Sequence, residues 1–357
     1  MTDSPGRALV VQTAFLGDVV LTLPLVQSLR RAHVATEIDV VVIPAARGIV
    51  ENHPDVRRVI VFDKRGRDRG MAGLLRIARR LRDGSYEMAL VPHRSLRSAL
   101  LVRLGRIRRS IGFDRSQGKF LFTDVVTYQP DLHEVERNLS LLGPLGIEVH
   151  PPEPPWIFPT TNDRSIVGEL LGGFAGKQPE ELVAIAPGTV WKTKQWPAER
   201  FGEVGKRLVS RGFAVVFIGG ESDRLVCETL AQRCGSDRAR SVAGRLTLLQ
   251  SAELIRRSRL LISNDSAPTH MAVATGTPAL AIFGATVPAF GFAPFGQLNS
   301  VIELVGLKCR PCSIHGGDDC PIGTFECMIG ISVEMVVERA LRQLEKRSSS
   351  GVGVVNS

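Results

Sequence analysis

Short runs of apolar residues alternate with amphipathic segments through the first half of the chain. Runs rich in β-branched residues are typical of buried strands, whereas apolar residues that recur every three or four positions indicate helices. The predicted strands are Ala8–Gln12, Glu37–Ile43, Val59–Phe62 and Glu87–Pro92. The predicted helices are Val19–Ala32, Ala46–Asn52, Gly73–Leu81 and Leu96–Gly105. Strands that alternate with helices predict a parallel, doubly wound α/β sheet.

A second alternating run follows a proline-rich segment. Five prolines occur in the ten residues from Pro151 to Thr160, and such a segment continues neither a helix nor a central strand. The predicted strands beyond it are Leu182–Ala186, Ala214–Ile218, Leu260–Ser263 and Ala279–Phe283. The predicted helices are Ala198–Ser210, Arg224–Arg233, Leu248–Arg256 and His270–Ala274. We therefore predict two Rossmann-like, doubly wound α/β domains that face a central cleft, where folds of this kind bind ligands.

The proline-rich segment also sets the predicted domain limits. The first domain covers residues 1–150, the linker residues 151–162, and the second domain residues 163–331. An amphipathic C-terminal helix is predicted at 332–347. The remaining residues, 348–357, are small and polar, so we expect a flexible tail.

The positive charge lies mainly in the first half. The net charge is +9; residues 1–150 contain 23 Lys and Arg against 16 Asp and Glu, whereas the remainder contains 22 against 20. A basic domain favours a nucleic acid, an anionic membrane surface or a phosphorylated glycan as partner, although ordinary surface charge explains it equally well. No segment resembles a signal peptide or reaches the roughly 20 apolar residues of a membrane helix, so we expect a cytoplasmic protein.

A possible acid–base residue follows the first strand. In the segment from Thr13 to Val19, Gly17 lets a ligand approach the backbone closely, and Asp18 opens the next helix. Asp18 fits two roles, either a helix N-cap or a general base for an acceptor hydroxyl.

Two segments of the second domain suit a nucleotide. The segment PGTVWKTKQWP, from Pro187 to Pro197, follows a strand with Thr189 and Lys194 in it, so backbone N–H groups, a hydroxyl and an ammonium converge on one anion. It is not a Walker A sequence, and its lysines also fit a solvated surface. The segment GGESD follows the next strand, and either Glu221 or Asp223 suits ribose hydroxyls unless the segment is a plain turn.

The most informative segment is SNDSAPTHMA, which begins at Ser263. Asp265, Ser266 and Thr269 stand between a strand and a helix, whose N-terminal amides favour a diphosphate. His270 fits either a phosphate hydrogen bond or a packed corner.

Taken in order, these segments resemble the ADP-heptose:lipopolysaccharide heptosyltransferases, which are GT-B glycosyltransferases. The resemblance spans nearly the whole chain, from LGDVVLTLPL through KQWPAERF to SNDSAPTHMA and IFGAT, and the run Cys-Arg-Pro-Cys makes it closest to heptosyltransferase II. It implies an inverting transfer of heptose from ADP-heptose to the inner core of lipopolysaccharide. The family's usual glycine after the Asp-Ser pair is Ala267 here.

The resemblance also implies roles for single residues. Asp18 would be the catalytic base and Lys194 the ligand of the donor diphosphate. Asp265, Ser266 and His270 would belong to the donor pocket, and either Glu221 or Asp223 would hold the ribose. Thr189 and Thr269 are donor-binding candidates from their positions after strands. The charge of the basic domain, rather than the resemblance, makes Arg94, Arg97, Lys119 and Arg137 candidates for binding the phosphorylated acceptor, together with Gly17; ordinary surface charge is the alternative for each of the four. No Asp-x-Asp motif accompanies them, so we expect no cofactor and no catalytic metal.

Four of the six cysteines lie within nineteen residues, as Cys309-x2-Cys312-x7-Cys320-x6-Cys327. Such a group in a cytosolic protein fits a structural zinc site or free thiols that pack a loop.

Two alternatives stay open. A related glycosyltransferase could use another nucleotide sugar or glycan. A nucleic-acid-binding protein would explain the arginines, but the basic half has no tryptophan, and Tyr86 and Tyr128 are its only tyrosines, so stacking platforms are scarce. We expect no nucleic-acid partner. A basic surface could instead rest peripherally on an anionic membrane, at the inner face of the inner membrane. The sequence leaves the oligomeric state open.

Overall fold

The computed structural model describes the chain except for residues 1–5, 36, 150, 173, 175–180 and 350–357. It contains two compact units, Met1–Phe158 and Pro159–Ser357, here called unit 1 and unit 2. Their boundary lies inside the predicted linker, and helix α6 (Thr161–Gly172) includes the last two residues of that linker. Most of the predicted tail lies outside the described residues.

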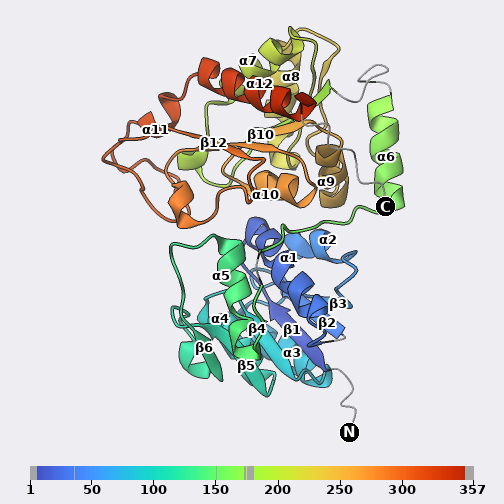
Figure 1. Cartoon of the computed structure of the whole chain (residues 1–357), viewed down its shortest axis with the longest axis vertical. Coiled ribbons are helices and arrows are strands. Elements are labelled where there is room, and N and C mark those ends of the chain that lie inside the picture. Colours follow the sequence, from blue (N-terminus) through green and yellow to red (C-terminus); the bar gives the residue numbers. More distant parts are fainter. Residues whose placement is uncertain (1–5, 36, 150, 173, 175–180, 350–357) are drawn as a thin grey trace. The chain divides into compact units, whose positions relative to one another are not determined.

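Unit 1 is built on a six-stranded parallel sheet of order β3-β2-β1-β4-β5-β6 (Figure 1). The strands are β1 (Arg7–Val11), β2 (Glu37–Val42), β3 (Arg58–Val61), β4 (Met88–Val91), β5 (Arg109–Phe113) and β6 (Asp124–Val126). The α-helices are α1 (Leu16–Arg31), α2 (Arg47–Val50), α3 (Gly70–Asp83), α4 (Leu96–Leu104) and α5 (Glu134–Ser140). Short 3₁₀ helices are η1 (Pro44–Ala46), η2 (Lys119–Leu121) and η3 (Gly143–Leu145). The four strands predicted in this half are therefore confirmed, whereas β5, β6 and α5 were not predicted.

Unit 2 repeats the arrangement, with strand order β12-β11-β10-β7-β8-β9. The strands are β7 (Leu182–Ala186), β8 (Ala214–Phe217), β9 (Ala239–Ser241), β10 (Leu260–Asn264), β11 (Ala279–Phe283) and β12 (Ser300–Glu303). The α-helices after α6 are α7 (Ala198–Val209), α8 (Arg224–Arg233), α9 (Leu248–Arg256), α10 (Ala267–Ala274), α11 (Glu326–Ile329) and α12 (Val333–Ser349). The 3₁₀ helices are η5 (Lys192–Lys194), η6 (Glu221–Asp223) and η7 (Pro288–Phe290). Two parallel α/β sheets confirm the predicted fold class.

The C-terminal helix belongs to the core of unit 2. Val336, Ala340 and Leu344 of α12 are buried in the same apolar cluster as residues of β7 and β8. The helix begins and ends close to the predicted limits, but it extends to Ser349 and so includes two residues assigned to the tail.

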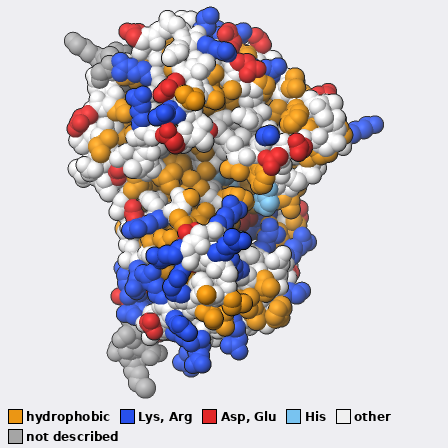
Figure 2. Space-filling model, turned by 180° about the vertical axis from the view of Figure 1, so that it is seen from behind, with side chains coloured by type: hydrophobic (Ala, Val, Ile, Leu, Met, Phe, Trp, Pro, Cys, Tyr) orange, Lys and Arg blue, Asp and Glu red, His pale blue; other side chains and the backbone are white. Residues whose placement is uncertain are grey.

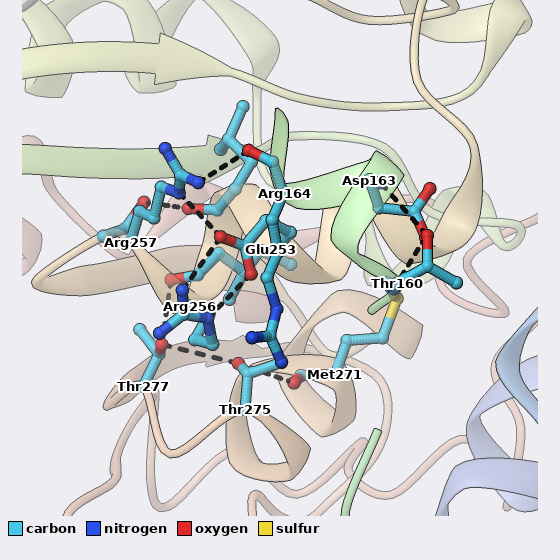
Figure 3. Close-up of polar contacts among 12 residues, drawn as sticks. Thr160, Asp163, Arg164, Glu253, Arg256, Arg257, Met271, Thr275 and Thr277 are labelled. Atoms are coloured by element: carbon cyan, nitrogen blue, oxygen red, sulfur yellow. Dashed lines mark hydrogen bonds and ion pairs between the residues drawn. The ribbon is translucent and has the colours of Figure 1, made fainter. Parts of the chain in front are cut away.

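A buried ion cluster fastens α6 to α9 (Figure 3). The Glu253 side chain is fully buried and accepts hydrogen bonds from Arg256 Nε at 2.7 Å and Arg257 Nε at 2.6 Å. Burial alone would raise the pKa of Glu253, but these two guanidinium groups outweigh burial and lower it. Arg257 also donates to the Arg164 carbonyl of α6 at 2.7 Å, so the cluster joins two helices that are far apart in sequence.

Each sheet changes winding direction at its first strand. In unit 1, β1 lies between β2 and β4, and in unit 2, β7 lies between β8 and β10. The connections that leave such neighbouring strands diverge, and the space between them at the carboxyl ends is where these sheets bind ligands. The Asp18 segment follows β1, and the Thr189 and Asp265 segments follow β7 and β10.

Candidate functional site

Lys194 and Asp265 form the centre of the site in unit 2. Lys194 Nζ lies 2.6 Å from Asp265 Oδ2, and the two side chains are only 13% and 6% exposed. Thr286 Oγ1 donates to the same carboxylate oxygen at 2.7 Å. Lys192, on the same 3₁₀ turn, is exposed. The turn therefore directs Lys194 inwards and Lys192 outwards. The Lys194 ammonium and the Asp265 carboxylate form an ion pair at the carboxyl ends of β7 and β10.

Asn264, which sequence reasoning did not select, holds these loops together. The side chain is completely buried at the end of β10. Its Nδ2 donates to the Pro187 carbonyl at 2.7 Å, and its Oδ1 accepts from the Trp196 backbone N–H at 3.0 Å. One amide thus fixes both ends of the segment that carries Thr189 and Lys194. Its position, as a polar residue at the end of a buried apolar strand, is the sequence feature that could have identified Asn264.

Helix α10 begins directly after the Lys194–Asp265 pair. Ser266 is its N-cap residue, and Ser266 Oγ lies 3.4 Å from the Gly188 carbonyl, beside half-buried Thr189. Thr269 and His270 are buried, and Thr269 Oγ1 donates to the Ser266 carbonyl inside the first turn. Ala267 is the first residue of the helix and is absent from the positive-φ residues of the described chain. Alanine therefore causes no backbone strain where the family has glycine.

The two acidic residues after β8 differ in their availability. Asp223 Oδ2 accepts a hydrogen bond from the Gly220 N–H at 2.8 Å and closes its own turn. A Cβ atom added to Gly188 would lie 2.6 Å from Asp223 Oδ2, so the Asp223 carboxylate packs directly against Gly188 on the neighbouring loop. Glu221 is exposed and lies 3.3 Å from Arg224 NH1. Glu221 is thus the freer of the two carboxylates.

The cysteine loop, residues 309–327, packs against the turn that carries Lys194. Thr193 donates to the Gly317 carbonyl from its N–H at 3.0 Å and from Oγ1 at 2.9 Å, and Oγ1 accepts from the Gly317 N–H at 2.8 Å. Gly316 has a positive φ of 90°, and a Cβ atom there would lie 2.9 Å from the Lys194 side chain. The loop therefore covers the lysine stem and fixes the turn.

The thiols of this loop do not form a ready-made metal site. All six cysteines are free thiols, and no three His, Cys, Asp or Glu side chains among the described residues converge enough to hold a metal ion. Burial raises the pKa values of Cys312 and Cys327. The Phe325 N–H donates to Cys320 Sγ at 3.4 Å, and this and neighbouring backbone N–H groups lower the pKa of Cys320. The zinc site stays a prediction.

An open pocket of about 410 Å³ lies elsewhere in unit 2. Residues 287–289, 303–307 and Arg310 line it, between the loops that follow β11 and β12. Arg310 belongs to the cysteine loop, but the predicted donor-binding residues lie on other loops, so we assign the pocket no part in the donor site.

The Asp18 side chain of unit 1 accepts a backbone hydrogen bond, and this bond is compatible with a role as general base. Helix α1 begins at Leu16, so Asp18 lies in its first turn, half-buried, and its Oδ2 accepts from the Phe15 N–H at 3.1 Å. Gly17 lies beside it in that turn. The simpler alternative, that Asp18 is the N-cap residue, is therefore wrong: Phe15 is the N-cap, and Asp18 stands three residues later and accepts from its N–H. A carboxylate has a second oxygen that can accept a proton.

Two residues that were not predicted, Lys64 and His93, contact Thr13 in the segment before Asp18. Lys64, in the loop after β3, donates to the Thr13 carbonyl at 2.5 Å. Burial is the main reason that its pKa is lowered, and the Asp18 charge acts in the opposite direction. His93 Nδ1 lies 2.9 Å from Thr13 Oγ1, and burial lowers its pKa to about 4, so the ring is neutral at pH 7. Both residues stand just after a predicted strand, and this position is the sequence feature that could have identified them.

The four predicted basic acceptor residues have different surroundings. Arg97 donates to the carbonyls of Lys64, Asp68 and Gly70, so its guanidinium organises a loop. Arg137 is 2% exposed and pairs with Glu134. Lys119 is exposed on η2, and Arg94 is half-buried. On the face of unit 1 seen in Figure 2, Lys and Arg side chains far outnumber Asp and Glu.

Comparisons with known proteins identify the family of this chain. Residues 74–316 match the sequence profile of glycosyltransferase family 9 (heptosyltransferase). The chain is 30% identical to lipopolysaccharide heptosyltransferase 3 of Escherichia coli, over 76% of this chain and 82% of that protein. Among solved structures, a family 9 glycosyl transferase from Veillonella parvula has a TM-score of 0.86 at 24% identity, covering 97% of this chain and 99% of the other. The E. coli ADP-heptose lps heptosyltransferase II has a TM-score of 0.79 at 22% identity, covering 96% and 99%. The chain therefore belongs to glycosyltransferase family 9 and is a glycosyltransferase.

Proposed function

We propose that this enzyme transfers a heptose from ADP-heptose to the inner core of lipopolysaccharide. The observation that carries the proposal is the Lys194–Asp265 pair at the start of α10, where an ammonium and the positive end of a helix dipole offer a site to a diphosphate. The names of its relatives supply the sugar and the acceptor. A different nucleotide sugar or glycan is the second candidate.

The donor would be held entirely by unit 2. Lys194 and the amides at the start of α10 would bind the diphosphate, with Thr189 and Ser266 beside them. Glu221 would accept hydrogen bonds from the ribose, because the Asp223 carboxylate is already engaged with Gly220. Asp265 would hold Lys194 in place rather than touch the phosphate, since two anions repel. Thr269 and His270 would shape the pocket from within the helix.

Asp18 would act as the general base. It would remove the proton from the acceptor hydroxyl as the hydroxyl oxygen attacks the anomeric carbon, and the bond to the diphosphate oxygen would break on the opposite face. The product then has inverted configuration, and ADP departs with the bonding electron pair. Lys194 and α10 would stabilise the charge that develops on the diphosphate, as a metal ion does in other transferases.

The acceptor would bind to unit 1 through its positive charge. Arg94 and Lys119 would contact the acidic core, Gly17 would allow it to approach, and Arg97 and Arg137 would order the surrounding loops. The acceptor is a lipid, so we propose that the enzyme works at the cytoplasmic face of the inner membrane, in peripheral contact with anionic lipids. Among the described residues, no helix combines the length and apolar character needed to cross a bilayer.

The decisive experiment measures transfer from ADP-heptose to truncated lipopolysaccharide in the presence of a chelator. Asp18→Asn should reduce transfer by about a hundredfold or more while ADP affinity stays unchanged. Asp83→Asn, an exposed carboxylate at the end of α3, is the matched control and should behave like the wild type. An inactive wild type that still binds ADP would exclude this donor or acceptor. A wild type that binds no nucleotide would refute the whole proposal.

A further inference from the structure

Three arginines surround one tyrosine ring in unit 1. The guanidinium carbons of Arg94, Arg137 and Arg115 lie 4.5, 5.0 and 5.7 Å from the centre of the Tyr128 ring. Tyr128 itself is buried and packs edge-on against Phe113. We call Arg94, Arg115 and Arg137 with this ring the Tyr128 platform. The ring attracts cations through its face, which offsets part of the repulsion among the three guanidinium groups.

The sheet topology brings these residues together. Arg94 follows β4, Arg115 follows β5 and Tyr128 follows β6, and these three strands are neighbours in the sheet. The Gln117 N–H donates to the Arg94 carbonyl at 3.0 Å, so the first two loops are also tied directly. Because β1 neighbours β4, the platform lies on the same edge of the sheet as Asp18.

Only one of the three guanidinium groups is neutralised. Arg137 Nε donates to Glu134 Oε2 at 2.8 Å and Arg137 NH1 donates to the Pro130 carbonyl at 3.0 Å. Among the residues that the structure describes, the Arg94 and Arg115 side chains have neither an ion pair nor a hydrogen bond. Each of them offers several N–H donors beside a buried ring, so two positive charges remain for a ligand.

The geometry points to a phosphate-binding site: we propose that Arg94 and Arg115 bind a phosphomonoester of the acceptor. A phosphomonoester carries a charge of about −1.5 to −2 at pH 7, which suits two guanidinium groups that have neither an ion pair nor a hydrogen bond within the described part of the chain. Planar guanidinium groups bind phosphate oxygens through paired N–H donors. This inference rests on the proposed acceptor class and adds to it a site for one defined group, on the edge of the sheet that carries the base.

The acceptor assay tests this site with matched glycolipids. One acceptor retains its phosphates, a second lacks those of the glycan core, and a third lacks those of the lipid headgroup. Arg94→Gln and Arg115→Gln should each raise the KM for the phosphorylated acceptor about tenfold or more, with kcat nearly unchanged. Neither variant should alter the KM for an acceptor that lacks the phosphate bound by these arginines. The acceptor whose KM stays unchanged therefore shows whether that phosphate belongs to the glycan core or to the lipid headgroup. Arg103→Gln, an exposed residue in the last turn of α4, is the control.

A binding measurement separates this inference from the proposed function. With ADP at saturation, titration with inorganic phosphate should show a site in the wild type that the Arg94→Gln/Arg115→Gln double variant lacks. Phosphate binding without any transfer would mean that the site is correct and the acceptor wrong. If transfer occurs but each variant changes the KM for all three acceptors equally, or changes none of them, the phosphate site would be wrong. The proposed function would still stand.

Discussion

Removal of the Lys194 charge separates the structural and functional roles of the Lys194–Asp265 pair. Lys194→Met keeps most of the side chain's length but leaves the Asp265 carboxylate without its cation. Removing one partner of a buried ion pair costs about 3–5 kcal/mol. Because Thr286 Oγ1 still donates to this carboxylate, we expect the lower end, about 3 kcal/mol in the free energy of unfolding. For a unit of this size that is a fall in Tm of roughly 6–12 °C.

The double variant Lys194→Met/Asp265→Asn should recover most of this loss, because no buried charge then remains unpaired. Its ADP affinity should stay about tenfold or more below that of the wild type, since the ammonium that we assign to the diphosphate is missing. Thermal unfolding and ADP titration of the wild type, both variants and Lys192→Met measure the two effects. Lys192 is exposed on the same turn, so its replacement should change neither.

Two results would refute this reasoning. A single variant as stable as the wild type would show that the pair contributes nothing to stability, despite its 2.6 Å contact. A double variant that regains both stability and ADP affinity would remove Lys194 from the donor site.

Two further predictions concern titrating groups. Burial raises the pKa of Glu134 to about 7, against 4.5 in an unfolded chain, so the folded state binds the extra proton and the wild type should lose stability as pH rises from about 4.5 to 7. Glu134→Gln should lose this slope, at most about 1.4 kcal/mol per pH unit, in thermal unfolding at pH 5 to 8; equal slopes would contradict the assignment. Cys320, whose pKa backbone N–H groups lower, should react with iodoacetamide before the other thiols. Burial raises the pKa values of Cys227 and Cys234 to about 12 and 11, so mass spectrometry should find them modified last, and the reverse order would be inconsistent with the structure.

Most internal strands could be predicted from sequence, whereas three of the four edge strands, β6, β9 and β12, could not; the edge strand β3 was predicted and the internal strand β5 was missed. Leu182–Ala186 is apolar throughout because β7 is covered on both faces. By contrast, β12 begins with Ser300 and ends with Glu303, and β6 has only three residues. An edge strand has one neighbour and is partly exposed, so its apolar run is short and its partner is known only after folding. Helix α5 was missed although His133 and Glu136 form a capping box at its start.

The site residues divide in a similar way. Lys194 and Asp265 lie in motifs that follow predicted strands, and the structure brings them into contact. The structural roles of Arg97 and Asn264 could not be predicted from the sequence. Both side chains donate hydrogen bonds to backbone carbonyls in remote segments, as Asn264 does to Pro187. A carbonyl is present at every residue, so the sequence carries no mark of which one is bound. The Tyr128 platform depends likewise on β5 and β6, which were not predicted.

The hydrogen bonds between Thr193 and Gly317 also bear on how the enzyme is made. The two residues are 124 positions apart, and the Trp196 indole N–H reaches still further, to the Ile331 carbonyl 135 positions away. At about 5–20 residues per second, a ribosome takes roughly 6–25 s to add the partner of Thr193. Until then, the turn Lys192–Lys194 lacks its hydrogen bonds to Gly317. We therefore expect that a nucleotide bound at the proposed donor site can stabilise the second unit only after the cysteine loop has been synthesised.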